Sequence, residues 1–363
     1  MAKKRIAFFI CKKDLHNWNG GINYFKYFLN FLKSIDKYEI IIFTDNLDFI
    51  KKNFPKFVVK ATYTPLLNKN SLMFFLRRLV IWLFKKDYLI YKMLLKYKID
   101  VLSHRSLFRN KHFKVIGWIQ DAQHLKFKKF FLKKNYSERV KYIQNEIDHS
   151  DYIFVGSESV KKELIKKFNL NDKFIPLQIF IKPKKLLKKE DNFFYYPAQF
   201  WKHKNHIFLF KAFNTFVKKN PRTTLICTGS TVDHRFPEYF ENIKKYINEN
   251  NLKNKIIILN NVSFKKTQEL KKKCLALIIP SLYEGWNLVV EEARSINKTI
   301  ILSKIDSHLE QKYYKSIFFN FKNINSLSNI LINFSKYKKF NKKNKLFYKD
   351  LYIRNKLKLM ITY

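Results

Sequence analysis

Apolar and polar positions along the chain follow two alternating periods, and the alternation predicts an α/β fold. Short apolar runs that indicate strands in the first half lie at residues 6–11, 39–43, 101–103, 115–119 and 152–155. Helical spacing is found between or after these runs, at residues 23–32, 71–97, 138–150 and 158–168. Buried strands give short continuous apolar runs, whereas helices place apolar residues three or four positions apart. We therefore predict a parallel sheet covered by helices.

A second series of the same kind follows a Lys-rich segment. Its strand-like runs lie at residues 193–196, 224–227, 256–259, 275–279 and 299–302. Its helical segments lie at residues 206–219, 236–248, 264–273 and 288–296. The prediction is a chain of two doubly wound domains, 1–180 and 191–335, with a linker at 181–190 and a basic helical tail at 336–363.

Composition adds an extreme positive charge to this picture. The chain has 363 residues, of which 47% are apolar, enough for two domains with full cores. Its net charge is +45, from 73 Lys and Arg against 28 Asp and Glu. Asn, Ile, Phe and Tyr are also abundant and Gly is scarce, so compositional drift explains the charge as well as attraction to polyanions does. The two explanations do not exclude each other.

Cysteine usage and the N-terminus bear on the compartment. Cys11, Cys227 and Cys274 each lie in or beside an apolar run and show no paired spacing, which indicates buried thiols in a reducing compartment. The chain lacks the apolar core of a signal peptide, and no stretch reaches the roughly 18–20 apolar residues of a spanning helix. The sequence predicts a cytoplasmic protein that is not integral to a membrane.

Two segments, 71–84 and 126–134, mix bulky apolar residues with cations. Helices that lie in a membrane interface have this composition, and positive charge favours peripheral contact with an anionic membrane at the inner face of the cell membrane. A buried core helix with one solvated face is an equally open alternative.

The most informative stretch is residues 280–293, P-S-L-Y-E-G-W-N-L-V-V-E-E-A. It follows the apolar run at 275–279 and changes to helical spacing after a turn at Glu284-Gly285. Because the first amides of a helix have no partners inside it, this arrangement predicts an anion site. Two carboxylates, Glu284 and Glu292, frame the site and suit a hydroxyl-rich ligand. The alternative is that the helix dipole alone favours acidic residues here.

This stretch resembles the glutamate-x7-glutamate signature of family-4 retaining glycosyltransferases. The resemblance implies the GT-B fold, in which an acceptor domain and a nucleotide-sugar domain, both Rossmann-like, face each other across a cleft. It implies that Glu284 binds hydroxyls of the transferred hexose and that Glu292 binds the ribose of the nucleotide. The donor phosphates would lie against the turn and the helix start, at Gly285, Trp286, Asn287 and Leu288. The tail at 336–363 would pack back on the first domain.

Residues 197–206, P-A-Q-F-W-K-H-K-N-H, follow the first strand of the second series. They resemble the family segment in which an Arg and, five positions later, a Lys hold the donor diphosphate. Lys204 matches the Lys, but Gln199 replaces the Arg, so Lys202 or His203 would have to supply the missing charge. A cation is needed because negative charge builds on the leaving diphosphate. The alternative is a solvated basic loop in a Lys-rich protein.

In the first half, Gly20-Gly21 resembles the glycine loop through which backbone amides approach the donor phosphate. The alternative is an ordinary loop that needs positive φ. Residues 117–125, G-W-I-Q-D-A-Q-H-L, resemble the segment whose His faces the reacting sugar, so His124 is a candidate catalytic residue. Asp121 in the same segment is explained as readily as a helix cap.

Two turns after later strands complete the candidate donor site. Thr228-Gly229-Ser230 and residues 259–262, L-N-N-V, occupy positions that shape the base pocket in the family, so Gly229 and Val262 are candidate donor-binding residues. Asn260 stands where the family usually has Gly.

The resemblance implies a retaining transferase that moves a hexose from a nucleoside diphosphate sugar to a hydroxyl of a glycan or lipid-linked glycan in surface polysaccharide or lipopolysaccharide synthesis. His124, Lys204 and Glu284 are the implied catalytic residues, and no metal or other cofactor is expected. The motifs resemble mannosyl- and rhamnosyl-type transferases, which favours GDP-mannose as donor. Two alternatives stay open: a basic nucleic-acid-binding protein, although no binding motif is present, and a GT-B domain that binds sugar nucleotide without turnover.

Overall fold

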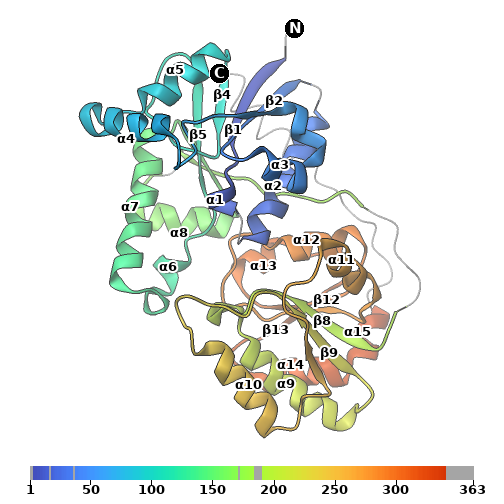
Figure 1. Cartoon of the computed structure of the whole chain (residues 1–363). Coiled ribbons are helices and arrows are strands. Elements are labelled where there is room, and N and C mark those ends of the chain that lie inside the picture. The colour runs from blue at the N-terminus through green and yellow to red at the C-terminus, as the bar shows by residue number, and fades with distance from the viewer. Residues whose placement is uncertain (1–2, 16–17, 36, 171, 184–189, 341–363) are drawn as a thin grey trace. The chain divides into compact units, whose positions relative to one another are not determined.

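The computed structural model of the chain describes residues 3–340 except 16–17, 36, 171 and 184–189. In that part the chain forms two α/β units (Figure 1). The first contains residues 3–126 and 133–179, and the second contains residues 127–132 and 180–340. Most of the predicted linker and nearly all of the predicted tail lie outside the described residues.

The first unit is a parallel seven-stranded sheet in the order β3-β2-β1-β4-β5-β6-β7. Its strands are β1 (Lys4–Phe9), β2 (Tyr38–Thr44), β3 (Ala61–Tyr63), β4 (Val101–Ser103), β5 (Lys114–Ile119), β6 (Tyr152–Val155) and β7 (Phe174–Pro176). Its α-helices are α1 (Lys12–Leu15), α2 (Asn19–Lys33), α3 (Leu47–Asn53), α4 (Leu72–Phe84), α5 (Tyr88–Lys96), α6 (Gln123–Lys126), α7 (Lys133–His149) and α8 (Glu158–Phe168). A 3-10 helix, η1 (Pro55–Lys60), precedes β3.

The second unit is a parallel six-stranded sheet in the order β10-β9-β8-β11-β12-β13. Its strands are β8 (Phe193–Pro197), β9 (Thr224–Thr228), β10 (Ile256–Ile258), β11 (Leu277–Ile279), β12 (Ile300–Ser303) and β13 (Ser316–Phe319). Its α-helices are α9 (His206–Lys219), α10 (Tyr239–Glu249), α11 (Phe264–Lys273), α12 (Leu288–Ser295), α13 (Asp306–Glu310), α14 (Ile324–Ile332) and α15 (Phe334–Phe340). Two 3-10 helices are η2 (Lys128–Phe130) and η3 (Lys202–Lys204).

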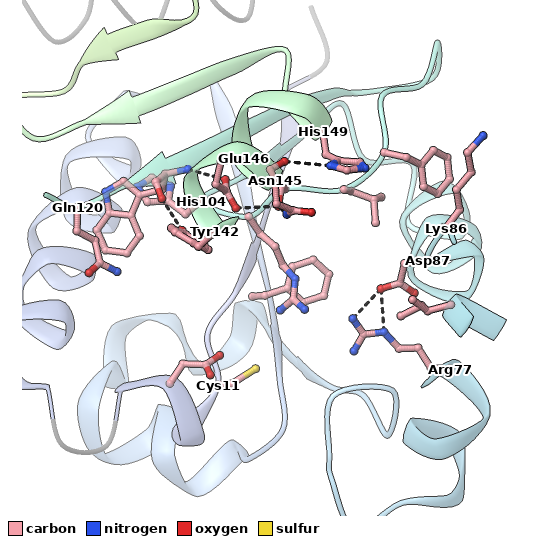
Figure 2. Close-up of a pocket in the computed structure, with 18 of the residues that line it drawn as sticks. Cys11, Arg77, Lys86, Asp87, His104, Gln120, Tyr142, Asn145, Glu146 and His149 are labelled. Carbon is pink, nitrogen blue, oxygen red and sulfur yellow. Dashed lines mark hydrogen bonds and ion pairs between the residues drawn. The ribbon is translucent and has the colours of Figure 1, made fainter. Parts of the chain in front are cut away.

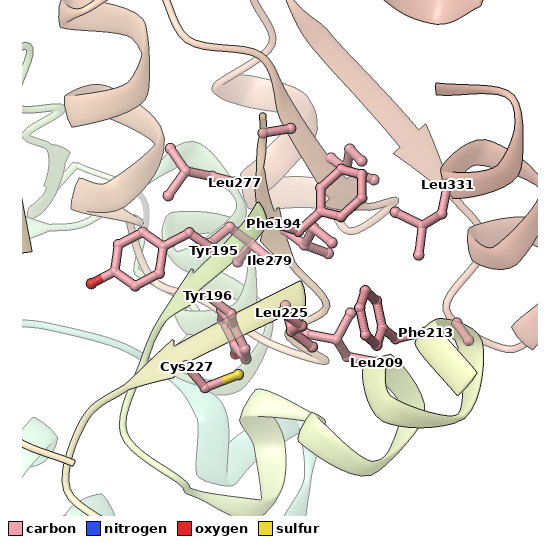
Figure 3. Close-up of a cluster of buried hydrophobic side chains, with 14 of the residues drawn as sticks. Phe194, Tyr195, Tyr196, Leu209, Phe213, Leu225, Cys227, Leu277, Ile279 and Leu331 are labelled. Carbon is pink, nitrogen blue, oxygen red and sulfur yellow. The ribbon is translucent and has the colours of Figure 1, made fainter. Parts of the chain in front are cut away.

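Strand β8 is the centre of the second unit. Its four aromatic residues, Phe193 to Tyr196, are all buried, because helices cover both faces of a parallel sheet and a central strand has no solvated side. Helix α9 packs Leu209 and Phe213 into the same cluster (Figure 3). Each such side chain contributes about 1.5–3 kcal/mol when it leaves water. The core therefore fixes β8, and with it the loop that follows β8 at the edge of the sheet.

The predicted α/β class and the two doubly wound sheets are confirmed, with three local corrections. The single helical pattern at 71–97 is two helices, because Lys85 adopts a left-handed backbone (φ 54°) and Asp87 caps α5. Helix α2 begins at Asn19 and not near Asn23. The interface helix suggested for 126–134 is wrong, since this segment forms only the end of α6, η2 and the start of α7. Three short strands, β3, β7 and β13, were not predicted.

Both sheets reverse their strand order at one point. In the first unit the order runs outward from β1 in one direction and from β4 in the other, and in the second unit it does so from β8 and β11. The loops that leave neighbouring strands on opposite sides of such a point separate and leave a crevice at the carboxyl edge. This topology predicts one binding site beside β1 and β4 and another beside β8 and β11.

Candidate functional site

The loops after β8 and β11 are joined at the point where the second sheet reverses. The amide of Leu282 donates to the carbonyl of His203 at 2.8 Å, and the Asn205 side chain donates to the carbonyl of Pro280 at 3.3 Å. Asn205 has a left-handed backbone (φ 61°), which Asn tolerates better than most residues and which ends η3 before α9 begins. The two longest predicted motifs of the second half thus form one structure.

Lys204 and Glu284 meet at this junction. The Lys204 ammonium lies 2.7 Å from Oε1 and 2.9 Å from Oε2 of Glu284, and the side chains are 17% and 10% exposed. The Tyr196 hydroxyl donates to the Lys204 carbonyl at 2.7 Å, which ties the loop to the central strand. Removing either charge would leave the other poorly solvated and unpaired. The pair is therefore a preformed cation and carboxylate, eighty residues apart in sequence, at the edge of the sheet.

The start of α12 differs from the prediction of open amides. The amide of Asn287 donates to Oε1 of Gln311 at 3.0 Å, so a phosphate oxygen would have to displace Gln311 to accept from it. The Asn287 side chain caps the helix by accepting from the Val289 amide at 2.9 Å. Gln311 also donates to the Asn287 carbonyl and to Glu291, each at 2.9 Å. Gln311 follows α13, so the local sequence gave no sign of it. Gly285 is buried, and Trp286 and Leu288 are half-buried.

Glu292 points toward α11. It is 4% exposed, forms an ion pair with the buried Lys271, and accepts from Gln268 Nε2 at 3.3 Å. Its carboxylate is therefore already held by protein donors, and a ribose would have to share it. Glu291 is fully buried and pairs with Arg294 at 3.1 Å.

Gly229 allows the loop after β9 to approach the loop after β8. Its φ is +144°, and a Cβ there would lie 2.3 Å from the Ala198 carbonyl oxygen, so only Gly fits. Its amide donates to the carbonyl of Asn260 at 2.8 Å. Asn260 itself has φ 46°, which explains how it replaces the Gly that the family usually has. Gln199 and Val262 are half-buried beside these turns.

Gln199 stands where the family has an Arg, and other cations lie in or beside the same loop. Lys202 places its ammonium 4.1 Å from the Phe236 ring centroid, and His203 is 7% exposed. A further cation, Arg235, lies 3.5 Å from His203 Nδ1 and 5.6 Å from the Trp201 ring. The sequence analysis missed Arg235, because the strand-based motifs do not cover the long loop between β9 and α10.

Gly20 and Gly21 do not form a loop. Both lie in the first turn of α2 and neither has positive φ, so the predicted glycine loop and its alternative are both wrong. A Cβ at Gly21 would lie 2.2 Å from the Trp18 ring. The Trp18 indole stacks on Trp118 with centroids 5.8 Å apart. Gly21 is therefore required by the packing of an aromatic ring.

His124 is buried in α6 of the first unit. Its Nδ1 accepts from Arg139 Nε at 3.2 Å, and Arg139 also pairs with Asp121 at 2.5 Å. Burial, with a smaller contribution from Arg139, lowers the pKa of His124 to about 4 against an opposing effect of Asp121. The ring is therefore neutral at neutral pH. Asp121 also accepts from the Gln123 amide at 3.0 Å, which makes it a helix cap.

A cavity of about 780 Å³ lies at the reversal point of the first sheet. Segments after β1, β4 and β5 line it, together with α4 and α7, and Figure 2 shows His104, Tyr142 and Glu146 on one side and the Arg77–Asp87 pair on the other. Its cationic lining residues are Arg77, Lys85, Lys86 and Arg105. The Arg105 guanidinium lies 4.9 Å from the Phe9 ring, and burial lowers its pKa. Three acidic residues, Asp14, Asp87 and Glu146, also line it, so the cavity combines charged groups of both signs with aromatic walls.

The polar groups of this cavity were missed by the sequence analysis. Glu146 accepts from the Trp118 amide at 3.1 Å and from the Ser106 hydroxyl at 2.7 Å, and burial raises its pKa. Burial lowers the pKa of His104 to about 3, and its Nε2 lies 2.8 Å from the Tyr24 hydroxyl. A carboxylate between Ile143 and Ile147 on the buried stripe of α7 was the available signal.

The described part of the chain holds neither a metal-binding cluster nor a membrane-spanning helix. No group of three or more His, Cys, Asp or Glu residues is placed to hold a metal among the described residues. None of the helices in the described ranges is long and apolar enough to cross a membrane. All three cysteines are free and buried, as predicted, and burial raises the pKa of Cys11 to about 12.

Two doubly wound parallel sheets, each with its candidate site at the carboxyl edge, define the GT-B fold of glycosyltransferases. Solved structures agree. HepE of Anabaena in complex with UDP-glucose has a TM-score of 0.71 at 12% identity, covering 99% of this chain and 100% of that one. The lipopolysaccharide outer core galactosyltransferase WaaB, in its apo form, has a TM-score of 0.59 at 17% identity, covering 98% of this chain and 95% of that one. At these identities the likeness shows the fold alone.

Two sequence comparisons give matches. Residues 178–346 match the family described as Glycosyl transferases group 1. The O-antigen chain mannosyltransferase RfbU of Salmonella typhimurium is 26% identical over 238 residues, which cover 63% of this chain and 63% of that protein. The chain thus spans less than two thirds of the length of the curated relative that it matches.

Proposed function

We propose that the chain is a retaining glycosyltransferase that moves a hexose from a nucleoside diphosphate sugar to a hydroxyl of a glycan or lipid-linked glycan. The match of residues 178–346 to Glycosyl transferases group 1 supports the reaction class. The names of the O-antigen mannosyltransferase and the lipopolysaccharide galactosyltransferase support an acceptor in surface polysaccharide or lipopolysaccharide synthesis. The contact between Lys204 and Glu284 at the edge of the second sheet is the single observation that carries the proposal.

Lys204 supplies the positive charge for the departing diphosphate. As the bond between the anomeric carbon and the donor phosphate oxygen breaks, negative charge accumulates on that phosphate, and a preoriented ammonium stabilises it. Two short contacts to Glu284 hold the ammonium in place before the donor arrives. An ammonium has three donors, so Lys204 can bind a phosphate oxygen while it keeps Glu284 in position.

Glu284 orients the transferred hexose by accepting from its hydroxyls, and His124 is the catalytic residue proposed in the first unit. The acceptor oxygen attacks the anomeric carbon on the face that the diphosphate leaves. Its proton passes to the departing phosphate oxygen, so no enzyme nucleophile is needed and the configuration is retained. The start of α12 contributes less than the motif suggested, because Gln311 occupies the Asn287 amide.

The donor proposed is GDP-mannose, which the motif resemblance and the mannosyltransferase name of RfbU support. The acceptor is proposed to bind in the charged and aromatic cavity beside β1 and β4, because a volume of about 780 Å³ accommodates a saccharide. No divalent metal is proposed to take part, since Lys204 provides the charge that a metal would provide.

The test is transfer by the purified chain from GDP-mannose, UDP-glucose and UDP-galactose to lipid-linked glycan from a membrane extract, with and without EDTA. We expect transfer from GDP-mannose that survives EDTA and gives the α-linked product. Thermal unfolding with each donor should show stabilisation, about 2.7 kcal/mol at a concentration one hundred times Kd.

Several results would contradict the proposal. Stabilisation without transfer to any acceptor would favour a domain that binds sugar nucleotide without turnover. Salt-sensitive binding to nucleic acid of any sequence, with no response to the donors, would favour a nucleic-acid-binding protein. Loss of transfer in EDTA would remove the metal-independent mechanism, and an inverted product would remove retention.

A further inference from the structure

Helix α4 buries one of its two arginines and exposes most of its apolar residues. Arg77 is buried at 7% exposure, the reverse of an ordinary surface helix. The large apolar side chains that α4 exposes, with their exposed fractions, are Leu72 83%, Met73 38%, Phe75 61%, Leu76 43%, Leu79 51%, Trp82 67%, Leu83 55% and Phe84 60%. The buried core helix proposed as one alternative for residues 71–84 is therefore wrong.

Arg77 fixes this orientation. Its Nε and Nη2 donate to Oδ2 of Asp87 at 2.8 and 2.6 Å, and its Nη1 donates to the Leu66 carbonyl at 3.0 Å. Rolling α4 to bury its leucines would break these charge-assisted bonds and leave Asp87, which caps α5, without its partner. The contacts of Arg77 therefore hold the apolar face of α4 outward.

The exposed side chains form one stripe. Leu72, Leu76, Leu79 and Leu83 are spaced by three or four residues, so they lie on one face of the helix, and Trp82 lies beside them. Figure 1 shows α4 at the rim of the first unit, with α5 beside it. An apolar stripe of this length on a surface marks an interaction site.

Cations predominate in the sequence around the stripe. Between Asp48 and Asp87 the sequence contains no acidic residue and nine Lys and Arg residues. Four of the nine flank or lie on α4 and are exposed: Lys69, Arg78, Lys85 and Lys86. An apolar stripe with a cationic border complements the interface of an anionic bilayer, in which lipid phosphates lie above acyl chains.

We propose that α4 docks on an anionic lipid bilayer, with its leucine stripe and Trp82 at the level of the acyl chains and its cations among the lipid phosphates. With 13 residues, α4 is shorter than the roughly 20 residues that a spanning helix needs, so it lies in the plane of the interface. A second copy of the chain is a poorer occupant, because two chains of charge +45 would bring like charges together.

Docking of α4 has a consequence for the cavity of the first unit. Arg77 and Ile81 of α4 line that cavity. The bilayer would therefore lie on one side of the helix and the cavity on the other, where a membrane-held acceptor could enter. This consequence rests on the proposed function, whereas docking itself does not and is measured without any activity.

The test is flotation of the full chain with vesicles of equal parts phosphatidylglycerol and phosphatidylcholine, and with pure phosphatidylcholine vesicles. We expect binding to the anionic vesicles that persists in part at about 0.5 M salt, where contacts of surface charges alone are screened. The double variant Leu79→Ser, Trp82→Ser should bind at least roughly tenfold more weakly, because two exposed apolar side chains lose their burial in lipid.

The matched control is Val59→Ser, which removes an apolar side chain that is 89% exposed on η1 and not on α4. It should bind like the wild type. Equal binding by the double variant and the wild type would overturn the proposal and assign any attraction to overall charge. A wild-type dimer in solution that the double variant abolishes would overturn it in favour of a second copy. Unfolding midpoints of all variants should agree, since the altered side chains are exposed.

Discussion

The carboxyl edges of the two sheets share a topology, but their loops are packed differently. Beside β8 and β11 the loops are joined by hydrogen bonds, and a lysine and a glutamate neutralise each other at 2.7 Å. Beside β1 and β4 the loops enclose a cavity of about 780 Å³ lined by charged and aromatic side chains. One edge is tightly organised, and the other encloses space.

This difference indicates what each edge can bind. An edge whose loops are hydrogen-bonded to each other and hold an ammonium in place suits a diphosphate. The ammonium does not have to move when negative charge develops on the diphosphate. A roomy cavity with cations and stacked rings suits a larger ligand whose shape varies between related proteins. The donor is the constant partner of a sugar transferase and the acceptor is the variable one.

Removal of the Lys204 ammonium should have the largest effect. Lys204→Met is expected to lower the transfer rate roughly 100- to 1000-fold, about 2.7–4 kcal/mol, because the departing diphosphate loses its cation. The measurement is kcat with GDP-mannose. Lys244→Met is the matched control, since Lys244 contacts Glu241 at the same 2.7 Å on the exposed side of α10. A similar loss in both variants would show that the effect is not specific to the site.

Gly229 tests whether the joined edge depends on close backbone approach. Gly229→Ala is expected to lower the free energy of unfolding by roughly 2–3 kcal/mol, since φ is +144° and the new Cβ would lie 2.3 Å from the Ala198 oxygen. Urea unfolding at neutral pH measures this change. An unchanged midpoint would mean that the loops after β8 and β9 are not packed as described.

Both units should lose stability in acid because each buries histidine. Burial lowers the pKa of His104 in the first unit and of His206 in the second to about 3. A base whose folded pKa lies below its unfolded value contributes stability that is complete above about pH 6.5 and is lost as pH falls toward about 3. The free energy of unfolding should therefore fall between about pH 7.5 and pH 5.

His206→Phe isolates one of these contributions. The variant should reduce the acid-induced loss at about pH 5 by about 2 kcal/mol, because the ring that must remain neutral in the fold is gone. His206 stacks on Phe200 with centroids 4.1 Å apart, so an aromatic replacement keeps the packing partner. A pH profile parallel to that of the wild type would contradict the assignment.

A variant of Arg105 tests whether the first sheet edge binds the acceptor and not the donor. Arg105→Gln should reduce transfer roughly tenfold, about 1.4 kcal/mol, by weakening acceptor binding in the cavity. Its affinity for GDP-mannose, measured by calorimetry, should stay within about twofold of the wild type. A large loss of donor affinity would break the comparison, because the first edge would then hold the nucleotide.

The smallest effect is expected at Gly20. Gly20→Ala places a Cβ 3.0 Å from Trp18 Nε1 without positive φ, in the first turn of α2. The gain in helix propensity and the mild crowding offset each other, so unfolding should change by less than about 1 kcal/mol. A collapse of activity with unchanged stability would instead restore the predicted glycine contact with the donor phosphate.

Local pattern was enough to predict the central strands and the motif-bearing loops. The run of aromatic residues in β8 could only be a buried strand, and the turn at Gly285 marked the start of α12. The short strand β3 has only three residues, so it produced no recognisable run. The helical pattern continued through Lys85, whose left-handed backbone no period reveals.

The side chains that contact the candidate site residues could not be predicted from the sequence. Gln311 occupies the Asn287 amide and Lys271 holds Glu292, both across more than twenty residues, and no local spacing predicts such contacts. The sequence also could not predict that the apolar face of α4 is exposed, because its composition fits a core helix. Only the contacts of Arg77 show which face points inward.

The most direct test of the division between the two edges is a crystal structure of the chain with bound GDP-mannose. The account predicts the diphosphate within hydrogen-bond distance of the Lys204 ammonium, with the hexose against Glu284. A diphosphate seated in the cavity beside His104 and Arg105, with Lys204 and Glu284 still paired and uncontacted, would contradict it.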